Sequence, residues 1–351
     1  MKIITLLLIL LVILYSEERK CGHVPYLKLL SKDNPQIYEQ IKGAENKLKR
    51  YVFKRQENSI PQKIRTIPVV VHILWNRSQH NISDKQVHSQ IRVLNEDYRK
   101  VRNTNGYSRN SLATDTMIEF RLAKVDPNWK KTTGITRKRT KVKFFALDQM
   151  KFDHTGGMDA WDTTRYLNIW VCQARKGLLG YAQFPNGSKS LGHNKTLATD
   201  GVVINTLCFG RYGNTKKPFN LGRTATHEVG HWLGLRHIWG DGGCDKDDGI
   251  DDTPKASKAN RGHPKTRPYT CGSGDMYENY MDYSDDDAVN IFTYKQAQRL
   301  NATLTLYRFG LCEWDAFGKG VNNKLDEVSG DDFFGTGTEK KSDDYFDDND
   351  Y

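Results

Sequence analysis

The chain has 351 residues, of which 37% are hydrophobic and 27% are charged, a composition that indicates a largely soluble protein with one large folded domain or two. The formal net charge of +11 is uneven, because residues 331–351 carry a net charge of −6 and the remaining residues therefore carry +17. A basic body attracts nucleic acid or acidic surfaces. No alternation of aromatic and basic residues and no known nucleic-acid module accompanies it, so we interpret it as a solvated surface and expect no nucleic-acid partner.

The N-terminus has the layout of a signal peptide. Residues 3–14 are apolar and follow Lys2, and Ser16 is a suitable last residue of the leader. Because this run is too short to span a membrane comfortably, we predict that residues 1–16 are removed, that the protein is secreted and that it has no stable membrane insertion. A short membrane anchor is the alternative. Secretion would permit disulfides and glycosylation. The N-x-S/T sites are Asn76, Asn81, Asn186, Asn194 and Asn301.

Residues 17–65 are predicted to be a removable pro-segment. Cys21 lies in the basic context RKCGHVP, and a thiolate is a strong zinc ligand. Cys21 could therefore bind a zinc ion and keep an enzyme latent; a disulfide, for example with Cys312, is the alternative. Residues 34–52 could form a helix. Two dibasic pairs offer sites for release of the segment: Lys49-Arg50 and Lys54-Arg55.

From Thr66 onward the pattern predicts a folded domain. The run 66–74 is apolar and β-branched, which is typical of a buried strand. Residues 82–102 follow as a helix with one apolar face and Ser83 as its cap. Further strands are predicted at 117–125, 166–172, 180–184 and 201–206, and a loop with a short helix or ribbon is predicted between 126 and 150. This order predicts an α+β domain, a mixed sheet with helices packed on it.

The short strand GYAQF, residues 180–184, is bounded by Gly and Pro, as edge strands often are. An edge strand beside a catalytic site can pair with an extended peptide through main-chain hydrogen bonds. An ordinary edge strand without that role is the alternative.

The stretch HEVGHWLGLRH, residues 227–237, carries the strongest chemical signal. On a helix, His227 and His231 lie one turn apart on one face, so both imidazoles point to one metal ion. Gly234 permits a sharp turn that brings His237 back as a third ligand. Three imidazoles leave the fourth zinc position open, as in catalytic sites, and Glu228 can reach a water there. The motif predicts a zinc-dependent hydrolase; a surface helix that carries histidines is the alternative.

Past the histidines the chain becomes acidic. Residues 240–254 contain many carboxylates and glycines, a composition that suits calcium but lacks the EF-hand spacing, so a solvated acidic loop is the alternative. The sequence NYMDY at 279–283 and a final helix at about 293–307 follow. The tail over residues 313–351 is rich in Gly, Asp and Lys and is predicted to be disordered.

The motif and NYMDY together resemble the metzincin metallopeptidases, in which a methionine turn lies beneath the zinc. The segments TIPVVVHIL, SQIRVLNEDYR, YLNIWVC, LLGYAQFP, DGVVI, DDTP and NYMDYSDD are similar to the pappalysin family, on its ulilysin and cytophagalysin side, over roughly residues 65–310. The resemblance implies a metzincin-type catalytic domain with two subdomains over 66–312. The upper subdomain holds a twisted, mixed five-stranded sheet with long helices, and the irregular lower one holds the Met-turn and a C-terminal helix.

The resemblance also assigns roles by position. It implies zinc binding by the three histidines and general-base catalysis by Glu228. Met281 becomes the methionine of the turn, and Tyr283 is similar to the tyrosine that hydrogen-bonds the reacting carbonyl. Cys21, in the sequence CGH, is similar to the cysteine of the short pro-segments in that family. This resemblance favours the interpretation that Cys21 keeps the enzyme latent. Asp287 resembles an acidic residue at the floor of the pocket that binds the substrate residue just after the cut bond. A carboxylate there would favour Arg or Lys at that substrate position. A surface carboxylate without this role is the alternative.

Two structural features of the lower subdomain are implied as well. The acidic loop matches a family calcium site, with Asp248, the Ile250 carbonyl and Thr253 as the best-fitting ligands and Asp251 or Asp252 as further candidates. Cys244 and Cys271 fit a family disulfide. A second family disulfide is absent, because its two positions are His263 and Ala288. The partners of Cys172, Cys208 and Cys312 stay open.

We therefore expect a secreted, monomeric zinc endopeptidase with bound calcium, made as a latent zymogen, whose partner is a polypeptide substrate. A secreted zinc-containing protein that binds without catalysis is the first alternative, and a matrix-associated structural protein that uses the basic body is the second. The natural substrate is not encoded in any recognisable pattern.

Overall fold

The computed structural model describes residues 19–54, 60–186, 195–313 and 316–317, which all belong to one unit of internal contacts. The predicted signal peptide, Asn194 and nearly all of the acidic tail lie outside the described residues. Within the described part of the chain, no helix is both long and apolar enough to cross a membrane.

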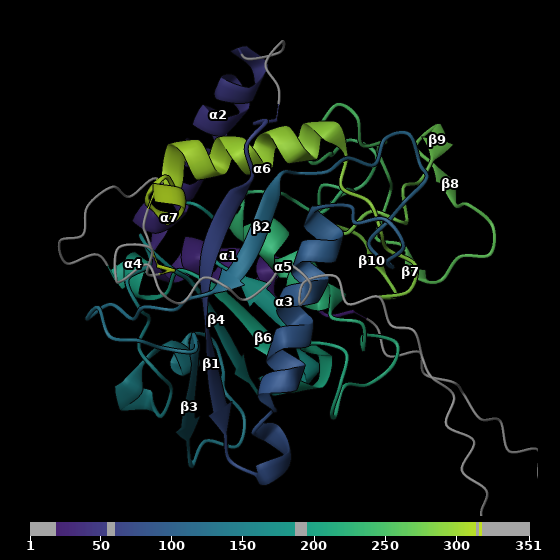
Figure 1. Cartoon of the computed structure of the whole chain (residues 1–351). Helices are drawn as coiled ribbons and strands as arrows, with labels where there is room; N and C mark the ends of the chain where they lie inside the picture. Colours follow the sequence, from purple (N-terminus) through teal and green to yellow (C-terminus); the bar gives the residue numbers. More distant parts are fainter. Residues whose placement is uncertain (1–18, 55–59, 187–194, 314–315, 318–351) are drawn as a thin grey trace, which may run out of the picture. The chain divides into compact units, whose positions relative to one another are not determined.

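A mixed sheet forms one half of the fold (Figure 1). Its strands are β1 (Arg65–Trp75), β2 (Ile118–Leu122), β3 (Ile135–Arg139), β4 (Leu167–Cys172), β5 (Gly180–Ala182) and β6 (Val202–Asn205). The order is β2-β1-β4-β6-β5, and only β5, at the edge, runs antiparallel to its neighbour. The sheet is five strands wide, as expected, because β2 and β3 lie one after the other along the same side of β1. On that side Val69 pairs with Leu122 and Val71 pairs with Ile135.

The strand β3 corrects the prediction for residues 126–150, which expected a loop with a short helix or ribbon. Its sequence ITRKR shows no apolar alternation, and Arg137 and Arg139 are exposed. The strand forms because β1 is long enough to offer unpaired backbone groups beyond the end of β2. Such a strand depends on main-chain pairing with a distant segment, so its own residues need not show the apolar alternation typical of strands.

Both faces of the sheet are buried, which explains the uninterrupted apolar run of β1. Alternate residues of a strand point to opposite faces. On one face Ile67 and Val69 join the main core with helices α3 (Asp84–Tyr98) and α5 (Arg223–Trp232). On the other face Leu74 and Trp170 pack against the loop around Phe145. As predicted, Ser83 caps α3: its hydroxyl accepts from the Gln86 amide at 3.2 Å.

The lower half of the fold is irregular. It contains the short pairs β7 (Arg261–Gly262) with β10 (Tyr283–Ser284) and β8 (Tyr269–Thr270) with β9 (Ser273–Gly274).

Three further helices are α4 (Lys195–Ala198), α6 (Tyr294–Tyr307) and α7 (Gly310–Glu313), and 3-10 turns cover 78–80, 149–151, 153–155, 175–177 and 206–208. A capping box between Thr293 and Gln296 begins α6 at the predicted place.

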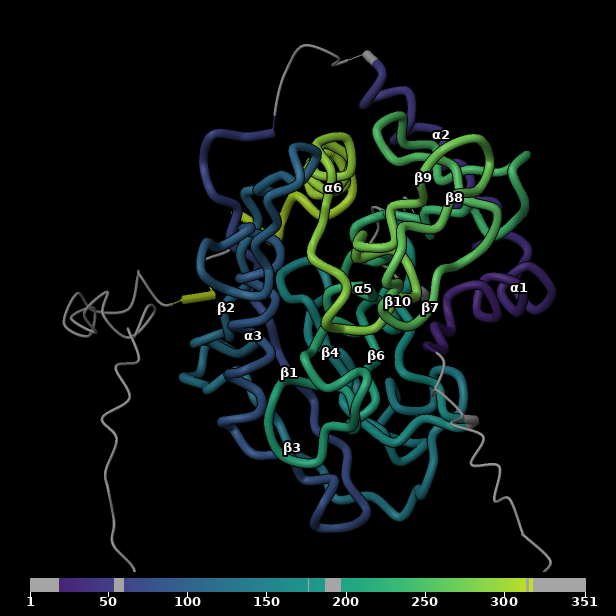
Figure 2. Tube along the Cα trace, turned by 90° about the vertical axis from the view of Figure 1, so that its right-hand side faces the viewer, coloured from purple at the N-terminus to yellow at the C-terminus, as the bar shows by residue number. Residues whose placement is uncertain are grey.

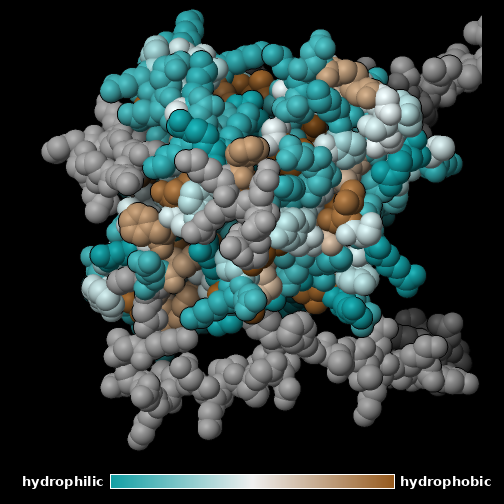
Figure 3. All heavy atoms as spheres, turned by 90° about the horizontal axis from the view of Figure 1, so that it is seen from above, coloured by the Kyte–Doolittle hydropathy of each residue, from teal (hydrophilic) through white to brown (hydrophobic). Residues whose placement is uncertain are grey.

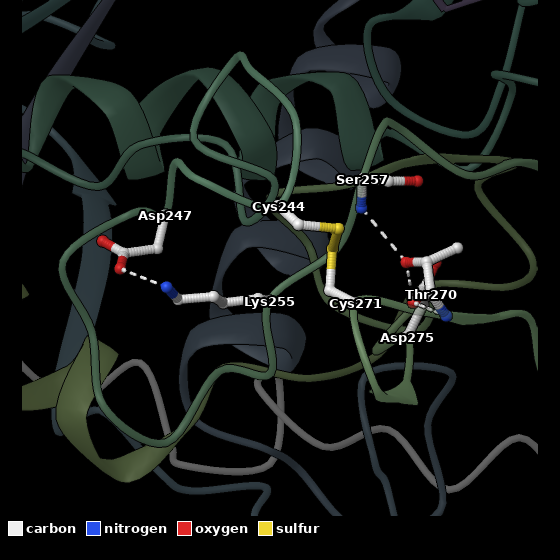
Figure 4. Close-up of a disulfide and its surroundings, with 7 residues drawn as sticks. All are labelled: Cys244, Asp247, Lys255, Ser257, Thr270, Cys271 and Asp275. Carbon is white, nitrogen blue, oxygen red and sulfur yellow. Dashed lines mark hydrogen bonds and ion pairs between the residues drawn. A yellow bond between two sulfur atoms is a disulfide. The ribbon is translucent and has the colours of Figure 1, made fainter.

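The structure contains the disulfide between Cys244 and Cys271 (Figure 4), which joins positions 27 residues apart in this irregular half. Beside it, Thr270 donates its hydroxyl to Asp275 at 2.6 Å. Cys172 and Cys208 are buried free thiols, and Cys312 is free and exposed. The alternative pairing of Cys21 with Cys312 is therefore wrong.

The predicted pro-segment, residues 17–65, contains two helices, α1 (His23–Asp33) and α2 (Pro35–Lys54). Helix α2 confirms the helix predicted at 34–52 and ends at Lys54, whereas α1 was not predicted. Helix α2 packs against α6, where the Tyr307 hydroxyl donates to the Ala44 carbonyl at 3.0 Å. Figure 2 shows α1 and α2 on the same side of the molecule as the irregular half that carries β7 to β10.

The candidate glycosylation sites differ in access. Asn301 is buried within α6, where its side-chain amide donates to the Thr116 carbonyl at 2.8 Å, and Asn186 is buried as well. Asn81 is exposed and Asn76 is half-buried. Of the described sites, only Asn76 and Asn81 therefore remain accessible for glycosylation.

Candidate metal centre

The three histidines converge as the motif predicts. Helix α5 presents His227 and His231 on one face and ends at Trp232. Gly234 then adopts a φ of +88°, a conformation that side chains disfavour, and the chain reverses toward His237. A Cβ at Gly234 would also lie 2.9 Å from the Thr303 hydroxyl, so the turn needs glycine for both conformation and space.

Each imidazole is oriented by an acceptor at Nδ1. His227 contacts the Tyr280 carbonyl at 2.7 Å, His231 the Leu235 carbonyl at 2.8 Å and His237 the Asp241 carboxylate at 2.6 Å. These oxygens can only accept, so in the neutral rings Nδ1 carries the proton and Nε2 keeps its lone pair. The two carbonyls were not predicted, because backbone acceptors leave no mark in the sequence.

The Nε2 atoms face one another in a geometry that fits a metal ion. The Nε2 of His231 lies 3.1 Å from the Nε2 atoms of both His227 and His237. Facing lone pairs repel, and a cation between them removes the repulsion. Zinc–nitrogen bonds of about 2.0–2.1 Å in tetrahedral geometry place neighbouring nitrogens roughly 3.3 Å apart. Burial, followed by mutual repulsion, lowers the pKa of His227 and His231, which keeps both rings neutral and able to bind a metal.

Cys21 is the fourth member of this cluster. Its sulfur and one ring nitrogen from each of the three histidines lie within 4.8 Å of one another, and all four side chains are buried. The residues around Cys21 continue the sheet, because Gly22 donates to the Gly180 carbonyl at 2.8 Å and Leu179 donates to the Lys20 carbonyl at 3.0 Å. The edge strand β5 thus pairs with an extended peptide, which here is the pro-segment running parallel to it.

Glu228 lies beside the centre without belonging to the ligand cluster. Its carboxylate is 3.5 Å from the Cys21 sulfur, and burial raises its pKa to about 8. Burial, followed by the nearby Glu228 charge, also raises the pKa of Cys21. Gly180 makes room for this carboxylate, since a Cβ there would lie 2.8 Å from the Glu228 Cγ and from the Val203 carbonyl oxygen.

The NYMDY segment supports the centre from beneath. Met281 is fully buried, and its sulfur would lie only 2.5 Å from a Cβ placed on Gly230, between the two helical histidines. The Tyr283 ring packs 4.9 Å from the His237 ring and 4.7 Å from the Trp239 ring, and Trp239 itself stacks on His237 at 4.3 Å. Burial, followed by the Cys21 and Glu228 charges, raises the pKa of Tyr283, so its hydroxyl stays protonated.

The structure leaves the Asp287 side chain exposed and buries the side chain of its neighbour Asp286. The Asp287 side chain is 64% exposed and lies 3.4 Å from His263, whereas the Asp286 side chain is fully buried. Asp286 pairs at 2.7 Å with Arg19 of the pro-segment, which also donates to the Ser284 carbonyl at 3.2 Å. The other Asp286 oxygen accepts from the Leu221 amide at 2.9 Å, which fixes the carboxylate. Asp286, and not the predicted Asp287, is thus the carboxylate that binds the arginine of residues 17–65.

His23 is a further residue that sequence reasoning missed. Its ring stacks between the rings of Phe184, at 4.2 Å, and His231, at 4.3 Å. Arg19, Cys21 and His23, the first residue of α1, are spaced two residues apart, and all three are buried. That i, i+2 spacing was visible in the sequence, but only the contacts identify its purpose.

The acidic loop brings together the three residues expected to bind calcium. The Thr253 hydroxyl lies 2.9 Å from both Asp248 carboxylate oxygens and 2.8 Å from the Ile250 carbonyl. Burial raises the pKa of Asp248 to about 7. Asp252 has another task, because it accepts from the Thr293 hydroxyl at 2.6 Å and the Lys295 amide at 2.8 Å at the start of α6.

Comparisons with known proteins agree with this geometry. The sequence family described as pregnancy-associated plasma protein-A, peptidase M43, matches residues 152–305. An extracellular metalloprotease of Arthroderma benhamiae is 30% identical over 308 residues, which cover 84% of this chain and 87% of that protein. Extracellular metalloprotease 1 of Coccidioides posadasii is 33% identical over 296 residues, which cover 84% and 91%.

Two solved structures from Tannerella forsythia are similar as well. Promirolysin superposes with a TM-score of 0.74 at 41% identity, covering 84% of this chain and 97% of that one. Mature mirolysin in complex with a cleaved peptide has a TM-score of 0.66 at 45% identity, covering 72% of this chain and 97% of that one.

Proposed function

This chain belongs to the pappalysin family of metzincin zinc metalloproteases, and from that premise we propose that it is a secreted endopeptidase, made as a latent zymogen, that prefers Arg or Lys directly after the cut bond. The observation that carries the proposal is the convergence of Cys21, His227, His231 and His237 beside Glu228. The three histidines would hold zinc, and Cys21 would hold the fourth position until the pro-segment leaves. The apolar run at 3–14 and relatives named as extracellular support secretion.

The reaction is hydrolysis of a peptide bond in the cleft between the sheet and the Met-turn. When bound, zinc supplies an activated water near neutral pH and polarises the carbonyl. The edge strand β5 pairs with the substrate backbone, as it pairs with residues 20–22 here. Glu228 accepts the proton of the attacking water and passes it to the leaving amine. The Tyr283 hydroxyl donates to the carbonyl oxygen as that oxygen gains negative charge.

The pro-segment supports both the latency and the preference for Arg or Lys. Arg19 fills the buried Asp286 pocket and Cys21 reaches the histidines two residues later, so one strand blocks the pocket and the centre together. Promirolysin matches 84% of this chain and mature mirolysin matches 72%, although 97% of each of those two chains is covered. The additional part that promirolysin matches is consistent with a pro-segment of this length.

The test of the proposal is digestion of a mixed peptide library. The full chain, activated by limited proteolysis near the dibasic pairs, should produce new N-termini that begin with Arg or Lys. A zinc chelator should abolish the cleavage, and added zinc should restore it, because the neutral imidazoles rebind the metal. Cleavage that persists with the chelator would contradict a zinc enzyme, and no cleavage with zinc bound would favour a non-catalytic binding protein.

Replacing Cys21 with serine should activate the full-length chain without processing. Serine is a much weaker zinc ligand than a thiolate, while Arg19 and helix α2 still hold the pro-segment, so we expect partial activity, about tenfold above the uncleaved wild type, a change of about 1.4 kcal/mol. The measurement is hydrolysis of an Arg-containing peptide before any cleavage of the chain. Cys312→Ser is the matched control, since that thiol is exposed and free. Equal activation in both variants would contradict a role for Cys21 in latency.

Calcium should stabilise the fold through the acidic loop. The convergence of Asp248, Thr253 and the Ile250 carbonyl on one point supplies hard oxygen ligands. We expect calcium to raise the melting temperature by several degrees by binding the folded state. The Asp248→Asn variant should lose this response, whereas Asp251→Asn should keep it, because the Asp251 side chain is 90% exposed. An unchanged response in Asp248→Asn would remove the loop as the calcium site.

A further inference from the structure

A second buried ion-pair site lies where helix α2 meets the catalytic domain. On one face of α2, Ile41, Ala44, Glu45 and Leu48 are spaced as helical neighbours, and all four are buried or nearly so. Glu45 is the only charged residue among them. Its carboxylate is hydrogen-bonded to Arg236, and its other oxygen lies 3.5 Å from the Arg299 guanidinium. Figure 3 looks down on the face that carries α2 and α6 in Figure 1, and hydrophilic residues cover most of it.

The two arginines lie outside residues 17–65, and one of them, Arg299, also has a hydrogen bond that does not involve that segment. Arg299 comes from α6, its side chain is only 3% exposed, and its Nε donates to the Gly234 carbonyl at 2.7 Å. Arg236 lies in the turn between Gly234 and His237 and is 37% exposed. Both cations are thus tied to the turn of the histidine motif. Burial lowers the pKa of Arg299, and the carboxylates of Glu45 and Asp248 oppose that shift.

The site adjoins the cleft. Phe184 stacks on His23, which stacks on His231, and Phe184 also lines a small cavity with Leu48, Gly234 and Arg299. Along the pro-segment, Arg19 contacts Asp286, and His23 then lies between His231 and Phe184. Further along the chain, Glu45 of α2 contacts Arg236 and Arg299. The arginines therefore lie beyond the end of the cleft opposite to the Asp286 pocket.

We propose that, once the pro-segment has been released, Arg236 and Arg299 form an anion-binding subsite that takes a carboxylate side chain of the substrate upstream of the cut bond. This inference rests on the proposed peptidase function and extends it. The pro-segment places an arginine on the buried Asp286 and a glutamate between the buried Arg299 and the partly exposed Arg236, so each polar site receives the opposite charge. Release of α2 takes Glu45 away from Arg236 and Arg299 and leaves Asp248 as the carboxylate that still acts on Arg299. A substrate carboxylate in the vacated space would restore the lost charge pair.

A substrate carboxylate is the occupant that the surroundings favour. Arg236 and Arg299 offer guanidinium donors that match a carboxylate. Phe184 and Pro185, which line a cavity with Arg299, suit the apolar part of a peptide. The direction follows from the proposed chemistry: the Asp286 pocket takes the residue after the cut bond, so the opposite end of the cleft takes residues before it.

The experiment compares three series of peptides that share one cleavable core with Arg after the cut bond. They differ only in Glu, Gln or Lys, placed in turn at successive positions before that bond. For the full chain activated by limited proteolysis, we expect kcat/KM to be about tenfold higher with Glu at the matching position. Arg236→Glu should invert the preference, so that a Lys peptide exceeds the Gln peptide. Arg92→Glu, an exposed position on α3, is the matched control and should keep the wild-type ratio.

Equilibrium binding of the same peptides to the activated Glu228→Ala variant, followed by fluorescence anisotropy, separates the two proposals. Tighter binding of the Glu peptide supports the subsite even if no enzyme preparation cleaves it, in which case the peptidase function fails alone. Cleavage and binding that are equal for Glu and Gln at every position overturn the subsite and leave the peptidase intact. An unchanged ratio in Arg236→Glu would also overturn it.

Discussion

Replacing Glu228 with alanine should lower kcat by about 10²–10⁴-fold or more, while the zinc content stays at that of the wild type. The carboxylate lies beside the ligand cluster without joining it, so its loss removes the base and leaves the three histidines in place. The measurements are kcat on an Arg-containing peptide, metal content and the melting temperature of the activated chain.

Glu228→Gln is the matched variant for this prediction. It keeps the size of the side chain beside Gly180 but cannot accept a proton, so it should be as inactive as the alanine variant. Burial under the pro-segment raises the Glu228 pKa to about 8; opening the cleft restores water and thereby favours the ionised base. Substantial turnover in the glutamine variant would show that another group takes the proton.

The second large effect is expected for Asp286→Asn in activated enzyme. An arginine of the substrate would then enter a buried pocket without its counter-charge, which costs about 2–5 kcal/mol. We therefore expect kcat/KM for peptides with Arg after the cut bond to fall by roughly 30-fold or more. Peptides with an uncharged residue there should be affected far less, so the ratio of the two is the quantity to measure.

Asp287→Asn is the control for that experiment, because this neighbouring carboxylate is largely exposed and pairs with His263. It should keep the wild-type ratio. Asp286 also accepts from the Leu221 and Arg223 amides, and asparagine retains one oxygen for that purpose, so melting temperatures should be compared alongside. A larger loss in Asp287→Asn than in Asp286→Asn would return the specificity role to Asp287.

The local chemistry of the site was readable because it depends on spacing along one segment. His227, His231 and Gly234 act within one helix and one turn, whose periodicity and conformational needs are properties of the residues themselves. The apolar run of β1 and the cap at Ser83 were predictable for the same reason. The pappalysin resemblance then supplied Met281 and Tyr283, which the structure brings to the histidines.

Other features were decided by contacts between distant segments. Residues 285 to 287 are three successive aspartates that the sequence does not distinguish. Only the path of the backbone after the Met-turn buries the side chain of Asp286 and exposes that of Asp287. Strand β3 exists because β1 offers it a free edge. Glu45 is an ordinary helix residue until α2 packs beside Arg236 and Arg299.

By itself, then, the sequence of this protein determined the histidine motif with Glu228 beside its first histidine, and the order of most strands and helices, since these follow from short-range geometry and apolar periodicity. Only the tertiary structure decided that Asp286 is buried while Asp287 is exposed, that Cys21 reaches the three histidines, and which charged residues pair with Arg19 and Glu45. Burial and ion pairing depend on the environment that remote residues create, and that environment comes into being only when the chain is folded.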